Sequence, residues 1–191
     1  MIERSSLLSL EAYARERSSF RAKVLEHKKH RTVSLGEHVT LLFEDELTVR
    51  YQVQEMLRIE RIFEEDGIRH ELEAYNPLVP DGANWKATML IEYPEADERR
   101  RMLARLKGIE RRVWVRIGGG ERIYAVADED LERENDEKTS SVHFLRFELG
   151  TAAAPLKQGA SVAVGVDHPE YRAELDPVPP EVRAALAKDL A

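Results

Sequence analysis

The residues best suited to chemistry in this chain lie in two neighbouring helical segments between positions 45 and 76. Glu55 belongs to the first segment, and His70, Glu71 and Glu73 belong to the second. Carboxylates and imidazoles hold divalent metals and transfer protons. Glu55, His70 and either Glu71 or Glu73 could therefore form a metal or acid–base site. The alternative, which we favour, is a buried ion pair that ties the helices together, because structural networks gather the same residue types.

The position of Glu55 on its helix requires a partner. With about 100° between successive residues, Glu55 falls between two isoleucines of the apolar arc. A carboxylate removed from water needs a cation, several hydrogen bonds or a proton. Arg58, one turn further on, and Arg69 or His70 of the next helix are the nearest candidates. The candidate catalytic residues are Glu55, Arg58, His70 and Glu71, and the candidate metal ligands are Glu55, His70 and Glu73.

The helix that carries Glu55 is predicted to span residues 46–63. Asp45 can cap its first turn, and Gly67 offers a place to end. Apolar residues occupy most of its circumference, which is typical of a helix enclosed on several sides. The remaining polar stripe consists of Arg50, Gln54, Arg58 and Arg61. A second, shorter helix is predicted with Asp66 as its N-cap and an end before Pro77.

The rest of the chain predicts one more long helix and then mostly strands. Residues 5–28 have a helical apolar pattern with Ser5 or Ser6 as the cap, and residues 32–43 alternate like strands broken at Gly36. Further strands are predicted at 85–93, 112–117, 122–126, 141–149, 161–166 and 171–175, and helices at 94–106 and after Pro180. We therefore expect a single α+β domain, helix-rich over 1–76 and strand-rich over 77–191, with the N-terminal helices packed on a mainly antiparallel β-sheet.

Three further histidines lie between positions 27 and 38. His27 and His30 are one helical turn apart, a spacing that can hold a metal. Two lysines lie between them, so cation repulsion favours a solvated basic helix end. His38 is a lone histidine in a strand pattern, and we expect it to face solvent.

Composition and charge exclude several functional classes. The 191 residues carry a net charge of −7, which disfavours nucleic acids and anionic membranes as partners. The charge is segregated: residues 15–31 and 98–116 are basic, whereas 128–137 hold seven acids and one arginine. Such an acidic block is usually a solvated loop.

Cysteine is absent, so no iron–sulfur cluster held by this protein is expected, and other cofactors are unknown. No signal-peptide core and no long apolar window is present. We therefore expect a cytoplasmic protein.

Three blocks carry a family resemblance: VSLGEHVTLLFEDELTVRYQVQEMLRIE, then LEAYNPLVP, then WKATMLIEY. In this order they resemble a bacterial family catalogued as domain of unknown function three-five-zero-one, across nearly the whole chain. The family brings no established activity. Its members are often encoded beside rubrerythrin-like proteins and iron–sulfur oxidoreductases related to heterodisulfide reductase subunits. The resemblance therefore implies a redox or peroxide-defence setting.

Two functions follow from these observations. The first is a non-enzymatic accessory protein that docks onto a redox partner, either rubrerythrin-like or an iron–sulfur oxidoreductase. The second is a metal-dependent enzyme with its Glu/His site between the central helices. Nucleic-acid binding through the two basic segments is disfavoured by the overall charge.

Overall fold

The computed structural model of the chain describes residues 1–127 and 138–191. The acidic block, residues 128–137, lies outside the described residues, so its prediction as a solvated loop stays a prediction.

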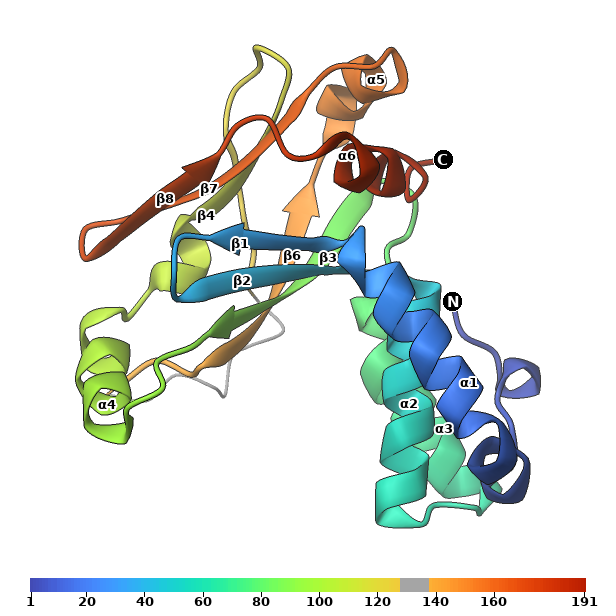
Figure 1. Cartoon of the computed structure of the whole chain (residues 1–191). Coiled ribbons are helices and arrows are strands. Elements are labelled where there is room, and N and C mark those ends of the chain that lie inside the picture. The colour runs from blue at the N-terminus through green and yellow to red at the C-terminus, as the bar shows by residue number, and fades with distance from the viewer. Residues whose placement is uncertain (128–137) are drawn as a thin grey trace.

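Two four-stranded sheets, both wholly antiparallel, form the strand-rich part (Figure 1). Sheet A has the order β1 (Thr32–Leu35), β2 (Val39–Glu44), β3 (Asn84–Ile91) and β6 (Val142–Glu148). Sheet B has the order β5 (Ile123–Tyr124), β4 (Val113–Ile117), β7 (Val162–His168) and β8 (Tyr171–Leu175). The predicted α+β class with antiparallel strands is confirmed, with two sheets where the sequence suggested one.

The inward side chains of both sheets share one hydrophobic core, because alternate residues of each strand point to the same side. Val113 and Val115 of β4 belong to it, for example, whereas Trp114 between them does not. Three short helices add apolar residues to this core: α4 (Ala96–Arg105), α5 (Ala153–Lys157) and α6 (Pro180–Ala187). Single 3-10 turns occupy Arg4–Ser6, Asn76–Leu78, Ile109–Arg112 and Gly150–Ala152.

Three N-terminal helices project from one end of sheet A, and we call them the helical arm (Figure 1). They are α1 (Leu10–Lys29), α2 (Glu46–Glu60) and α3 (Glu65–Tyr75). The arm has a second hydrophobic cluster, to which α2 contributes Val49, Val53 and Leu57. Because α1 leads into β1 and β2 leads into α2, the hairpin β1–β2 forms the base of the arm. Among the described helices, α2 has the most buried residues, as predicted.

The start of α2 was predicted correctly, and its end was not. Asp45 accepts a hydrogen bond from the N–H of Thr48, whose hydroxyl accepts one from the N–H of Asp45, so the two form a capping box. The helix ends at Glu60, three residues before the predicted Phe63, because Arg61 takes a left-handed conformation with φ 53°. Residues beyond this point leave the helix axis.

Two other local predictions were wrong. The first helix begins after Ser9, which caps it through the N–H of Ala12, because Arg4–Ser6 forms a separate turn. Gln54, assigned to the polar stripe, is buried. Its amide oxygen accepts from the N–H of Leu8 at 2.6 Å, so it holds the N-terminal segment against α2.

None of the helices in the described ranges is long and apolar enough to cross a membrane.

Candidate functional site

Glu55 lies at the centre of a polar network between α1 and α2. Arg17 donates to both carboxylate oxygens, from Nε at 2.7 Å and from Nη2 at 2.8 Å. The Tyr13 hydroxyl donates at 2.7 Å, and Arg58 Nη2 donates at 3.2 Å. The predicted partner Arg58 is therefore present, and Arg17 supplies the stronger, bidentate pair. We call Tyr13, Arg17, Glu55 and Arg58 the arm network.

The arm network fixes the ionisation of its members. Hydrogen bonds from Arg17, and then from Tyr13 and Arg58, lower the pKa of Glu55 to about 2 although partial burial opposes them. Burial, followed by the hydrogen bond to the ionised Glu55, raises the pKa of Tyr13 above its usual range. At neutral pH, Glu55 is therefore an anion and Tyr13 a neutral donor. A carboxylate with such a low pKa is a poor general base.

The other predicted site residues lie away from this network. His70 and Glu73 are exposed on α3, and Glu71 is half-buried there. Arg69 pairs with Asp66 of its own helix, at 3.0 Å. Within residues 1–127 and 138–191, no group of three or more His, Asp or Glu residues is placed to hold a metal ion. Of the predicted set, the described chain brings together Glu55 and Arg58, and this arrangement fits an ion pair better than a metal centre.

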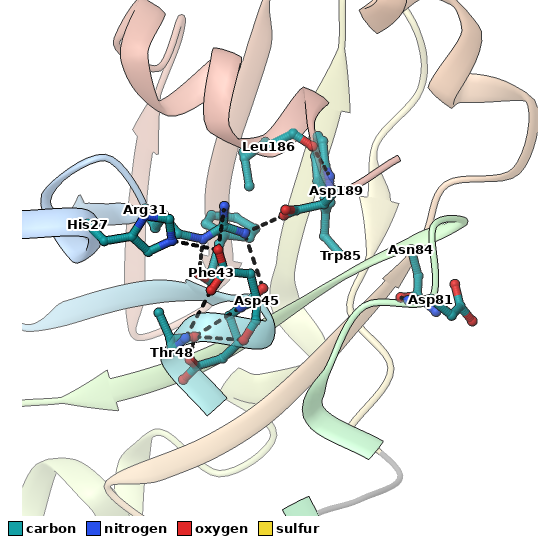
Figure 2. A network of polar contacts seen from close by, with 11 residues as sticks. His27, Arg31, Phe43, Asp45, Thr48, Asp81, Asn84, Trp85, Leu186 and Asp189 are labelled. Atoms are coloured by element: carbon teal, nitrogen blue, oxygen red, sulfur yellow. Dashed lines mark hydrogen bonds and ion pairs between the residues drawn. The ribbon is translucent and has the colours of Figure 1, made fainter. Parts of the chain in front are cut away.

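A second polar network ties the base of the arm to the turn that follows the C-terminal helix α6, as Figure 2 shows. Arg31 is its centre, and its side chain is only 2% exposed. It donates to the carbonyls of Phe43 at 2.8 Å and Glu44 at 3.2 Å. It also pairs with the carboxylates of Asp45 and Asp189. We call His27, Arg31, Asp45 and Asp189 the base network.

Two carboxylates of the base network have opposite pKa shifts. Burial works to raise the pKa of Asp45, but Arg31, the Thr48 N–H and His27 together hold it below its usual range. Burial raises the pKa of Asp189 to about 6 even though Arg31 lowers it. His27 contacts Asp45 at 2.5 Å, so it serves this network and does not form a ligand pair with His30.

Sequence reasoning missed most of these residues. Tyr13 and Arg17 are spaced i and i+4, so the sequence does indicate that they share a helix face. The apolar pattern of residues 5–28 predicts the helix but does not indicate that this face contacts Glu55. Arg31 and Asp189 are 158 positions apart and carry no local signal.

Glu44 was also missed, although it is a buried carboxylate at the end of β2. It accepts hydrogen bonds from Thr48 at 2.5 Å, Thr88 at 2.6 Å and Gln52 at 3.0 Å. These donors join α2 to sheet A. Glu44 therefore has a structural use in the present geometry.

His38 also differs from its prediction as a solvent-facing strand residue. It lies in the turn between β1 and β2, and its ring stacks on Tyr93 with 3.9 Å between the ring centroids. Its Nδ1 lies 2.9 Å from the carbonyl oxygen of Glu92, which must accept, so Nδ1 carries the proton. The histidine thus ties the hairpin turn to the end of β3.

The tip of the arm exposes apolar side chains. Ile59 is 58% exposed and Phe63 is 70% exposed, on either side of the left-handed Arg61. Their neighbours in the sequence are exposed charged residues: Arg58, Glu60, Arg61 and Glu64. Apolar residues within a polar rim are typical of a protein-binding surface. We call Ile59 and Phe63 the arm tip.

Fold and site together define an α+β protein with an ion-paired helical arm. Its residues 1–190 match the family described as "Protein of unknown function (DUF3501)", and the chain belongs to this family. A solved structure from Burkholderia pseudomallei K96243, described as a novel protein of unknown function, is 57% identical. The match covers 100% of this chain and 99% of that one, with a TM-score of 0.94. A search of curated proteins gave no match.

Proposed function

We propose that the protein is a non-enzymatic accessory protein that docks onto a redox protein through the tip of its helical arm. The observation that carries this proposal is the exposure of Ile59 and Phe63 at the far end of the arm. Large apolar side chains exposed together within a charged rim lose contact with water when a partner covers them. A docking surface is the use that best explains their position.

The arm network supports a structural use of the central helices. Glu55, the strongest catalytic candidate, is held ionised by donors from its own chain, and its oxygens are occupied. A base or ligand should instead present a free lone pair to a substrate or metal. The network stiffens the α1–α2 pair, and a stiff helix pair presents its tip with little loss of conformational entropy on binding.

The family context gives the proposal a partner class. The rubrerythrin-like proteins and iron–sulfur oxidoreductases encoded beside family members suggest a redox or peroxide-defence setting. This chain has no cysteine, so the redox centre would belong to the partner. The accessory protein would position that partner or protect it.

Co-purification with each candidate partner tests the proposal. The wild-type chain should retain a rubrerythrin-like protein or an iron–sulfur oxidoreductase from the same genome. The double variant Ile59→Ser, Phe63→Ser should lose at least about tenfold in affinity, because both apolar anchors are gone. Retention should also weaken with salt, since charged rims steer association within a screening length of about 8 Å.

Tyr124→Ser is the matched control, because Tyr124 is an exposed aromatic residue on sheet B. It should bind like the wild type. Failure of both candidate partners to bind at low salt would refute the redox-partner proposal. Equal binding by the double variant would show that the arm tip is not the docking surface.

A further inference from the structure

The outer face of sheet B holds a polar hollow that the proposed function does not use. Its volume is about 610 Å³, within the range of small-molecule sites. Its lining includes Trp114, Asp167 and three arginines, Arg112, Arg122 and Arg172. Because Val113 and Val115 point into the core, Trp114 between them points to this outer face. The hollow lies on sheet B and not on the helical arm.

Trp114 forms the floor of the hollow. Its ring lies against Gly165 of β7, where an added Cβ would be 2.3 Å from ring atom Cζ2. The guanidinium of Arg122 lies over the other side, 4.1 Å from the ring centroid. The tryptophan is therefore buried on a sheet face that also carries the charged residues Asp167, Arg172 and Glu174. A glycine opposite the ring is what makes this arrangement possible.

Two polar atoms of opposite kind are left without partners here. The indole N–H of Trp114 is buried and has no acceptor in the described chain. Asp167 accepts from Tyr124 at 2.6 Å and from Arg122 at 3.2 Å through Oδ2, while its buried Oδ1 has no donor there. Buried polar groups are normally satisfied, so an unpaired donor and acceptor in one hollow indicate a polar ligand.

The charges of the hollow favour an anion. Arg122 is paired with Asp167, and its Nη2 lies 3.6 Å from Glu174. The side chains of Arg112 and Arg172 make no hydrogen bond or ion pair with any of the residues that the structure describes, and both residues are exposed. The lining therefore offers two uncommitted guanidinium groups in a protein whose net charge is −7. Guanidinium groups match the oxygens of a phosphate group in pairs.

We propose that this hollow binds a small phosphate ester. Arg112 and Arg172 hold the phosphate group. The polar body of the ligand accepts from the Trp114 indole and donates to Asp167. The site is independent of the arm tip, so its failure would leave the docking proposal untouched, and the reverse also holds.

Nuclear magnetic resonance of the two indole N–H groups tests this binding. Trp85 is the internal reference, because its N–H already donates to the Leu186 carbonyl at 3.0 Å in the core. Ribose 5-phosphate, ribose and inorganic phosphate are titrated separately at constant ionic strength. The Trp114 signal should move saturably with ribose 5-phosphate, bound at least about tenfold more tightly than inorganic phosphate. Ribose should move neither signal.

The variants Arg112→Gln and Arg172→Gln should each weaken ribose 5-phosphate binding at least about tenfold. Arg101→Gln is the matched control, since Arg101 is an exposed arginine on α4, and it should bind like the wild type. A Trp114 signal that stays fixed up to about 10 mM ribose 5-phosphate would overturn the proposal, since this corresponds to negligible affinity. Equal affinity for inorganic phosphate would reduce the site to an adventitious ion only. Unchanged binding in both arginine variants would also refute it.

Discussion

Glu55 shows how an ion-paired network can hold a carboxylate on the apolar arc of a helix. Four hydrogen bonds from three residues surround it, two of them from Arg17. Its side chain is 17% exposed and that of Arg17 is 32% exposed, so water still reaches the pair. The pair is intermediate between a surface ion pair and a fully buried one.

Glu55→Gln should lower the free energy of unfolding by about 1–2 kcal/mol, because charge-assisted bonds are lost while partly exposed arginines can rehydrate. This is less than the roughly 3–5 kcal/mol for breaking a fully buried pair. Urea unfolding at neutral pH measures the difference. Glu71→Gln, on the half-buried neighbour in α3, should change stability by less than about 0.5 kcal/mol. No loss in Glu55→Gln would contradict the structural use of the network.

The same residue predicts an acid dependence. Its folded-state pKa of about 2 lies below the usual value, so its contribution is present above about pH 4.3, the ordinary pKa of glutamate. The contribution is lost as the pH falls from there towards 2. Wild type and Glu55→Gln should therefore converge in stability over this window, and a constant difference would be inconsistent with it.

Asp189 should behave in the opposite way. Burial raises its folded-state pKa to about 6, so ionisation is harder in the folded protein than in the unfolded chain. The stability associated with the protonated form is present below about pH 4, the ordinary pKa of aspartate, and is lost as the pH rises to about 6. Relative to Asp189→Asn, the wild type should lose about 2 kcal/mol between these limits. Asp97→Asn, an exposed position on α4, is the control for the unfolding measurements. A gain in that interval would mean that Arg31 outweighs burial.

Among the elements, β4 and β7 depend on each other through one close contact. Trp114 and Gly165 are paired in the register, and the indole occupies the space a side chain at 165 would need. Gly165→Ala should destabilise the protein by about 2 kcal/mol or more, since the rigid ring must move and expose its apolar surface. Trp114→Leu by itself should also lower the free energy of unfolding. In the double variant it should remove the clash with the new alanine side chain at position 165, so the two changes in unfolding free energy should not add. Strict additivity would show that the two residues do not interfere.

The helices illustrate which local features the sequence predicts. The start of α2 was predicted from Asp45 because a capping side chain acts on backbone N–H groups within one turn. Its end was missed because Arg61, not a glycine, adopts the left-handed conformation. The wide apolar arc was read as burial throughout, yet Ile59 and Phe63 in the described structure are exposed. The apolar pattern cannot distinguish a buried position from an exposed one, since apolar side chains occupy both here.

For the whole molecule, the fold class was predictable from the sequence, but the division of the strands between two sheets was not. The short turns between successive strands predicted antiparallel pairing, because a parallel connection needs a longer crossover. The separation into two sheets depends on pairings such as β3 with β6 and β4 with β7, which join distant segments. The candidate site was likewise predicted only in part. Glu55 and Arg58 share a helix turn and were predicted together, whereas Arg17 and Arg31 reach their carboxylate partners Glu55 and Asp189 through contacts between segments far apart in the sequence.

The two polar networks give the arm its mechanical role in our account. The base network anchors the ends of α1 and α2 to the turn after α6 through Arg31 and Asp189, and the arm network joins the same two helices nearer the tip. A helical arm that is anchored at its base can present Ile59 and Phe63 to a partner in one orientation. We therefore expect the protein to dock through the arm tip.

Hydrogen–deuterium exchange of the protein with and without the proposed redox partner tests docking through the arm tip. We expect slowed exchange on binding at the end of α2 and the start of α3, about residues 56–68, because amides covered by a partner or stabilised by it open less often. Exchange in sheet B should stay unchanged. The Ile59→Ser, Phe63→Ser variant should show no such protection. Protection centred on sheet B, or a complex that forms with none at the arm tip, would contradict the account.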